Sequence, residues 1–200
     1  MKKKNSNSIN NSKNYGDRFH ELILTFFYCG KSIFAPGTVG TIGGIIFWLY
    51  FNYFMIINNV DISKYNLLML SINIFLTCYA LKFIPTYTKN INSKEIDHKS
   101  IVIDEVVGIL IAIQIFHYFS YPLFILNDTK FLIYLLLIFI IFRFFDIKKP
   151  LIIGYCDKKL KNPIGIMLDD ILCGIFTGIL ATFVYFYTHN SNFFRLINCE

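Results

Sequence analysis

Five long apolar blocks constrain this chain more than any other feature. Each is about 15–19 residues long, and they cover approximately residues 42–57, 67–84, 101–119, 131–147 and 171–187. A helix needs roughly 17–25 apolar residues to cross the hydrocarbon core of a bilayer, and flanking residues can complete a short span. The apolar residues fill whole blocks and do not follow a helical stripe. We therefore predict an all-α, polytopic membrane helical bundle with about five transmembrane helices.

The composition agrees with a membrane protein. Charged residues make up 16% of the chain, whereas soluble domains carry about 25%. Hydrophobic residues reach 55%. We expect no nucleic-acid partner, and the sequence does not fix an oligomeric state.

The two ends of the chain differ from the apolar blocks. Residues 1–18 are polar and of low complexity, which is typical of a disordered tail. In the segment 19–34, Glu21 and Lys31 bound only nine uncharged residues, too few to cross a membrane. We interpret that segment as a short interfacial or re-entrant helix. The predicted organisation is a tail at 1–18, one membrane domain at 19–188 and a short C-terminal tail at 189–200.

The distribution of Lys and Arg predicts the topology. With five spans, 16 of the 19 basic residues fall on the side of the N-terminus and the 85–100 and 148–170 loops. Only Lys64, Lys130 and Arg195 fall on the other side. By the positive-inside rule, the basic side is cytoplasmic.

Three carboxylates stand inside apolar runs, where a loop's general polarity does not account for them. Asp104 and Glu105 interrupt the run from Ile101 to Ile115, and Asp146 lies among aromatic residues. Ionisable groups near a membrane interior are costly and usually mark a functional site. Because the topology brings the ends of the spans to one side, we expect these acids to meet Asp169 and Asp170.

Such a cluster has the chemistry of a metal site. Carboxylates without His or Cys partners suit Mg²⁺, which prefers oxygen ligands and keeps waters free for a phosphate. The candidate ligands are Asp104, Glu105, Asp169 and Asp170. Helix capping is an alternative role for one of the two adjacent aspartates.

Basic and glycine-rich residues on the same side could hold a phosphate. A helix N-terminus with Gly37, Thr38, Gly40 and Thr41 offers N–H groups and hydroxyls, although glycines there also serve close packing. Arg143 and Lys149 could neutralise phosphoryl oxygens, and Lys148 could bind the substrate. The lysines have a second interpretation as topology or headgroup contacts. His98 could relay a proton or could be an ordinary loop residue.

Small residues at four-residue spacing predict close helix packing. The pairs are Gly40 and Gly44, Gly108 and Ala112, and Gly174 and Gly178. We favour packing for Gly108, Ala112 and Gly178.

Four motifs together resemble the phosphatidylglycerophosphatase A family over about residues 20–188. They are Pro36-Gly-Thr-x-Gly-Thr, Ile101-Val-x-Asp-Glu-x-x-Gly108, Phe142-Arg-x-x-Asp-x-x-Lys-Pro150 and Gly165-Ile-Met-x-Asp-Asp-Ile-x-x-Gly174. The resemblance implies Mg²⁺-dependent hydrolysis of phosphatidylglycerophosphate to phosphatidylglycerol in a bacterial inner membrane. It places the family's acidic positions at Asp104, Glu105, Asp146, Asp169 and Asp170.

Several alternatives stay open at this point. Asp146 is either a fifth metal ligand or the group that orients or deprotonates water, and an aspartyl-phosphate intermediate competes with direct attack by water. The substrate could be another lipid phosphate, such as a polyprenyl phosphate or phosphatidic acid. A carboxylate-lined transporter is less favoured, because the acids lie at span edges and no inverted repeat is visible.

Overall fold

The computed structural model describes residues 15–91, 98–120, 129–149 and 162–197, and within these ranges the regular elements are all helical. The elements are α1 (Tyr15–Leu24), the short 3₁₀ helix η1 (Cys29–Lys31), α2 (Pro36–Ile57), α3 (Ile62–Asn90), α4 (Ile103–Ser120), α5 (Thr129–Lys148) and α7 (Pro163–Ile197). The predicted all-α bundle is confirmed.

Both predicted tails begin or end at different residues in the structure. Residues 15–18, assigned above to the N-terminal tail, belong to α1, and residues 1–14 lie outside the described residues. Helix α7 continues to Ile197, past the predicted start of the C-terminal tail at 189. Regular helix therefore extends further toward both ends than hydropathy alone indicates.

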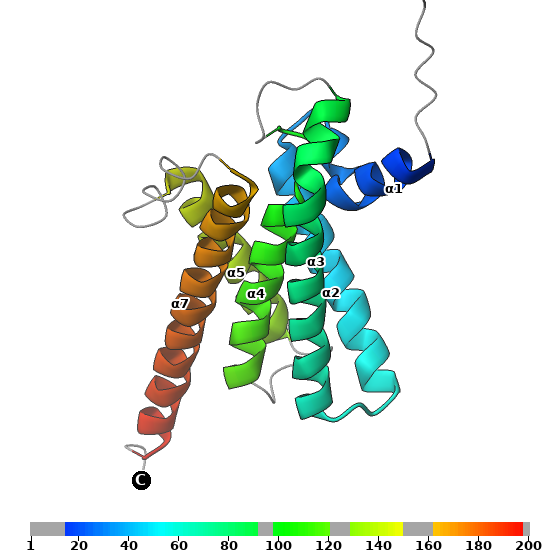
Figure 1. The fold of residues 1–200 in the computed structure, drawn as a ribbon. Helices are drawn as coiled ribbons and strands as arrows, with labels where there is room; N and C mark the ends of the chain where they lie inside the picture. Colours follow the sequence, from blue (N-terminus) through cyan, green and yellow to red (C-terminus); the bar gives the residue numbers. More distant parts are fainter. Residues whose placement is uncertain (1–14, 92–97, 121–128, 150–161, 198–200) are drawn as a thin grey trace, which may run out of the picture.

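Four of the described helices are long and apolar enough to cross a membrane. They are α2, α3, α4 and the segment Pro163–Thr188 of α7. Helix α5 is 20 residues long, but Lys130, Arg143 and Asp146 restrict its uncharged run to residues 131–142. It runs along the bundle with the other four (Figure 1). The five predicted apolar blocks thus correspond to five bundle helices, of which α5 is the most charged.

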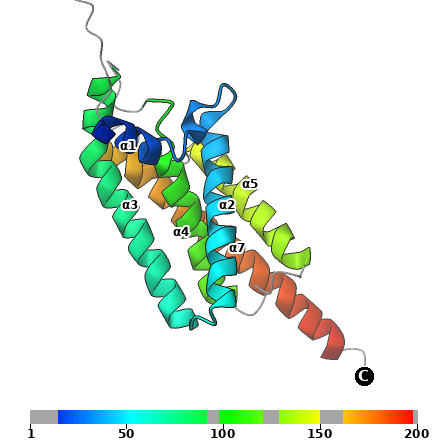
Figure 2. The same ribbon diagram turned by 90° about the vertical axis from the view of Figure 1, so that its right-hand side faces the viewer.

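The helices alternate in direction, so one end of the bundle gathers parts distant in sequence. Helices α2, α4 and α7 begin at the end drawn uppermost in Figure 1, and α3 and α5 finish there. Short α1 lies across the bundle at this same end, whereas α7 ends at the opposite one (Figures 1 and 2). The helix ends that the predicted topology places on one side therefore lie at one end of the bundle.

Helix α4 occupies the centre of the bundle. It packs against α2, α3, α5 and α7, and most of its residues are buried. The apolar side chains of α4 itself lie on all sides of the helix, which is the pattern of a helix enclosed by other helices. Asp104 and Glu105, in its first turn, are therefore placed inside the protein rather than in a solvent loop.

Glycines let α4 and α7 touch backbone to backbone. A Cβ atom at Gly174 would lie 2.2 Å from the Gly108 carbonyl oxygen, and one at Gly178 would lie 2.9 Å from the Ala112 oxygen. A Cβ at Gly108 would lie 2.7 Å from the backbone oxygen of Asp170. The packing role predicted for Gly108, Ala112 and Gly178 is confirmed. This contact also sets the distance between the acidic ends of the two helices.

The segment between α1 and α2 contains a tight turn, which an ion pair connects to α1. Phe26, Phe27 and Tyr28 all have left-handed backbone conformations with φ of 41°, 53° and 67°. Buried Glu21 forms an ion pair with Lys31, with 2.5 Å between Oε1 and Nζ. A short helix is present here, but it ends at Leu24, and a turn follows it within the segment 19–34 for which we predicted a short interfacial or re-entrant helix. The turn leads directly into the start of α2.

Candidate active site

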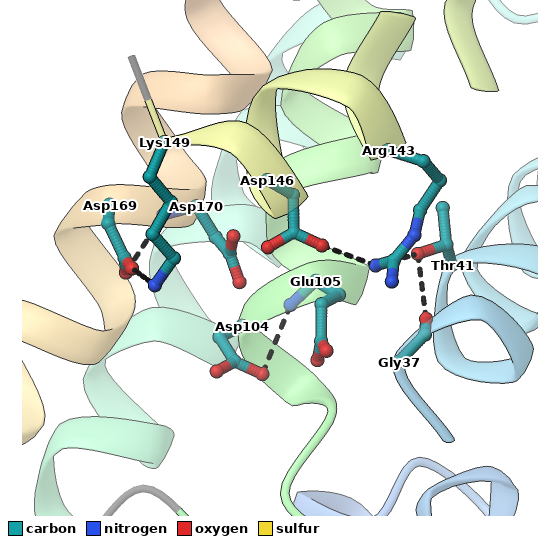
Figure 3. A network of polar contacts seen from close by, with 9 residues as sticks. All are labelled: Gly37, Thr41, Asp104, Glu105, Arg143, Asp146, Lys149, Asp169 and Asp170. Carbon is teal, nitrogen blue, oxygen red and sulfur yellow. Dashed lines mark hydrogen bonds and ion pairs between the residues drawn. The ribbon is translucent and has the colours of Figure 1, made fainter. Parts of the chain in front are cut away.

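Side chains from four helices converge at the end of the bundle where α2, α4 and α7 begin (Figure 3). Asp104 and Glu105 come from α4, Asp169 and Asp170 from α7, Arg143 and Asp146 from α5, and Gly37 and Thr41 from α2. Lys149 follows α5 directly. The predicted convergence of the four motifs is confirmed.

Three carboxylates form the centre of this site. Oxygen atoms of Asp104, Glu105 and Asp170 all lie within 4.8 Å of one another. Asp104 is 6% exposed and Asp170 is 4% exposed. Asp104 Oδ1 accepts the backbone N–H of Glu105 at 3.1 Å, which orients one of its oxygens at the start of α4.

This cluster fits a divalent cation. Glu105 Oε2 is buried and has no hydrogen-bond partner among the described residues. Ionised carboxylates held this close together in a buried site repel one another, so the arrangement favours a bound positive charge. Hard oxygen donors of this kind suit Mg²⁺ or Ca²⁺ better than softer metals.

Asp169 and Asp146 lie beside the cluster, and each is paired with a basic side chain. Lys149 Nζ lies 2.6 Å from Asp169 Oδ2. Arg143 Nη1 donates to Asp146 Oδ2. The group of mutually close carboxylates among the described residues therefore contains three of the four predicted ligands, and Asp169 lies next to it in an ion pair with Lys149.

Neither aspartate of α7 caps that helix. The helix begins at Pro163, so Asp169 and Asp170 lie in its second turn. Asn162 performs the capping, because its Oδ1 accepts the N–H of Gly165 at 2.9 Å. The capping alternative is wrong. Asn162 is a residue that the sequence reasoning missed, although Asn followed by Pro at the first helical position is a known helix-start signal.

The start of α2 contacts the acidic cluster through a glycine. A Cβ atom at Gly37 would lie 2.2 Å from Glu105 Oε1 and 3.3 Å from Arg143 Nη1. Buried Thr41 donates to the Gly37 carbonyl oxygen at 2.8 Å and accepts from Arg143 Nη1 at 3.4 Å. Gly37 and Thr41 therefore join α2 to both the carboxylates and the arginine.

Gly40 and Thr38, predicted with them, are placed differently. A Cβ at Gly40 would lie 2.7 Å from Val102 Cβ, so this glycine packs against the residue that leads into α4. Thr38 lies half-buried in the first turn of α2. The role of the α2 N-terminus in holding phosphate remains a prediction.

Lys148 and His98 lie away from these contacts. Lys148 is exposed at the last position of α5. His98 Nδ1 is 2.8 Å from the Ser100 hydroxyl, which is itself 2.9 Å from the Tyr87 hydroxyl on α3. This chain of polar contacts ties the segment before α4 to α3. It gives His98 a visible structural role, and Ser100 and Tyr87 were not singled out from the sequence.

The fold and the site together define an integral membrane protein. At one end of its bundle, a buried cluster of carboxylates suited to binding a cation lies beside two basic side chains. The phosphatidylglycerophosphatase A family model matches residues 22–185. The chain belongs to this family, and it is therefore a phosphatase.

The similar curated proteins agree with this assignment. Phosphatidylglycerophosphatase A of Haemophilus influenzae is 34% identical over 151 residues, covering 74% of this chain and 77% of that protein. Phosphatidylglycerophosphatase A of Escherichia coli is 28% identical over 172 residues, covering 84% and 83%. A Bacteroides thetaiotaomicron protein named as a putative phosphatidylinositol-3-phosphatase is 29% identical over 159 residues, covering 80% and 89%. No solved structure matches the chain.

Proposed function

We propose that this protein catalyses the Mg²⁺-dependent hydrolysis of phosphatidylglycerophosphate to phosphatidylglycerol and phosphate. The observation that carries the proposal is the cluster of Asp104, Glu105 and Asp170 beside Arg143 and Lys149, at one end of a membrane bundle. The names of two relatives supply the substrate. Such a site can act on the phosphate of a lipid whose acyl chains remain in the bilayer.

The carboxylates divide into metal ligands and a proton acceptor. Asp104, Glu105 and Asp170 would hold Mg²⁺, with Asp169 completing the set if Lys149 moves aside. A bound divalent cation would polarise the phosphate and lower the pKa of a coordinated water. Asp146 is the remaining carboxylate, and we assign to it the orientation and deprotonation of the attacking water.

The basic residues would bind the phosphoryl oxygens. Arg143 Nε is buried without a hydrogen-bond partner among the described residues, so this N–H is free to donate to a ligand. Thr41 and Asp146 hold the Nη1 atom of the same guanidinium, which fixes its orientation. Lys149 lies on the α7 side of the cluster, so positive charge flanks the carboxylates from two directions (Figure 3).

We place the reaction at the cytoplasmic face of a bacterial inner membrane. The support is the charge pattern, since 16 of the 19 Lys and Arg residues fall on the side of the site under the predicted topology. This orientation is tested with single cysteines introduced at Lys148 and at Lys64. Each is labelled from outside intact cells, and we expect only the Lys64 position to react. Labelling of the Lys148 position from outside intact cells would contradict it.

The substrate is tested with purified protein in mixed micelles, by release of inorganic phosphate. We expect phosphatidylglycerophosphate to give the highest kcat/KM when compared with phosphatidic acid, a polyprenyl phosphate and phosphatidylinositol 3-phosphate. The last substrate is included because of the name of the Bacteroides relative. Preference for any of the other three would replace the proposed substrate while keeping the phosphatase assignment.

A further inference from the structure

An apolar groove lies between α2 and α5. Its volume is about 320 Å³, and it is lined by Ile42 and Ile45 of α2 and by Leu132, Leu135, Leu136 and Phe139 of α5. Both helices pack against central α4. Figure 2 shows α5 inclined away from α2 toward the end of the bundle opposite the site.

The groove lies close to the candidate active site along both helices. Ile42 directly follows Thr41, whose hydroxyl accepts a hydrogen bond from Arg143. Phe139 is four residues before Arg143 on α5, and residues at that spacing lie on the same helix face, one turn apart. One end of the groove therefore lies about one helical turn from the arginine that would bind phosphate.

The distance along α5 from Arg143 to the far end of the groove matches one leaflet of a membrane. From Leu132 to Arg143 the helix rises by about 16 Å at ~1.5 Å per residue. Half of a hydrocarbon core of ~30 Å is about 15 Å. A chain that enters beside Arg143 and follows the groove to Leu132 would thus extend to about the middle of the bilayer.

A second, larger groove differs in chemistry. It has a volume of about 500 Å³ and lies between α3 and α4, where its lining includes Asn66, Asn73 and Gln114. Asn73 donates to Gln114 at 2.9 Å, but its own buried Oδ1 has no partner among the described residues. A groove with amide side chains in its lining is a less uniform match for an alkyl chain. The groove between α2 and α5 has only apolar side chains and is the better match for hydrocarbon.

We propose that an acyl chain of the phospholipid substrate lies in the groove between α2 and α5 while its phosphate is held at Arg143 and the carboxylate cluster. This inference rests on the proposed function and specifies how the substrate is oriented. The chain would enter sideways from the bilayer, so the lipid need not leave the membrane to be hydrolysed. The groove would thereby fix the position of the phosphate along α5.

Photocrosslinking in proteoliposomes tests the proposal without relying on hydrolysis. The probe is a phosphatidylglycerophosphate with a diazirine midway along one acyl chain, and the reference is a phosphatidylcholine with the same labelled chain. We expect the first lipid to label residues 132–139 selectively and the second to label all lipid-facing surfaces alike. Leu136→Trp should reduce the selective labelling about tenfold, because the indole fills the groove and displaces the chain.

Matched variants separate groove filling from general effects of a new tryptophan. The first control is Ile133→Trp. Ile133 is on the same helix and is 63% exposed, similar to Leu136 at 59%, but it does not line the groove. Ile74→Trp fills the other groove in the same way. Neither control should change the labelling. Leu132→Trp provides an independent second variant inside the groove, and size-exclusion chromatography verifies that each protein is folded.

The outcomes distinguish the two proposals. Equal labelling of residues 132–139 by both lipids, or unchanged labelling in both groove variants, would overturn the inference even if phosphatidylglycerophosphate is hydrolysed. Headgroup-selective labelling of the groove without any phosphate release would support the groove and contradict the proposed function.

Discussion

Gly37 offers a sensitive test of how closely α2 must approach the carboxylate cluster. A Cβ atom at this position would lie 2.2 Å from Glu105 Oε1, whereas favourable contacts between non-bonded heavy atoms begin at about 3.5 Å. In Gly37→Ala, the Glu105 carboxylate or the first turn of α2 must therefore move by roughly 1 Å. Glu105 is one of the three clustered carboxylates, so this movement changes the proposed metal site directly.

The effect should appear in catalysis more than in stability. A displacement of about 1 Å in a catalytic group can cost about 100-fold in rate. The clash involves the end of a side chain, which can rotate, so we expect the thermal midpoint of unfolding to change little. The assay is kcat and KM for phosphate release from phosphatidylglycerophosphate, with a Mg²⁺ titration for each protein.

The control is Gly16→Ala in α1. A Cβ at Gly16 would have no atom within 4 Å, so the same substitution should leave activity unchanged. Wild-type kcat and Mg²⁺ dependence in Gly37→Ala would refute the claim that Gly37 is needed for the approach to Glu105.

Substitutions at three further positions test other contacts. Lys149→Gln should lower kcat about 10- to 100-fold by removing a positive charge from beside the carboxylates, and an unchanged kcat would exclude Lys149 from phosphate binding. Gly174→Ala should destabilise the protein by about 1–3 kcal/mol, because its Cβ would lie 2.2 Å from the Gly108 carbonyl oxygen, and thermal unfolding in detergent measures this. Asn162→Ala should cost about 1 kcal/mol through loss of the α7 cap, while Asn162→Asp should retain the stability; equal loss in both would contradict the capping role.

The arrangement of the site could be predicted because two simple signals agree. Long apolar blocks give the number and direction of the helices, and the positions of the charges place four motifs at one end. Asp104 and Glu105 were recognisable because they interrupt an apolar run, and the structure buries the first and half-buries the second. The close pairs of small residues likewise indicated the contact between α4 and α7.

Helix boundaries were harder to predict. The apolar block that corresponds to α3 ends at 84, yet the helix continues through Pro85 to Asn90. Proline normally disrupts a helix because it lacks an N–H donor. Here the Thr88 hydroxyl donates to the carbonyl oxygens of Ile84 and Pro85, which supports the turn around the proline. Hydropathy does not register such local hydrogen bonds.

Individual pairings within the site were also beyond sequence reasoning. The ion pair of Lys149 with Asp169 joins residues 20 positions apart on different elements. Lys149 has a left-handed φ of 42° just after α5, a conformation that its residue type does not indicate. The sequence therefore identified Asp169 as a site residue without distinguishing an ion pair from metal ligation.

The most direct test of the central claim is a Mg²⁺ titration of phosphatidylglycerophosphate hydrolysis by the wild type, Asp170→Asn and Asp61→Asn. Asp61 is an exposed aspartate preceding α3, at the end of the bundle opposite the site, so it is a matched control for the substitution. The account predicts saturable activation by Mg²⁺ in the wild type and in Asp61→Asn, loss of activity in chelator, and at least about 100-fold lower kcat in Asp170→Asn. Full activity in chelator, or wild-type kcat with unchanged Mg²⁺ dependence in Asp170→Asn, would contradict it.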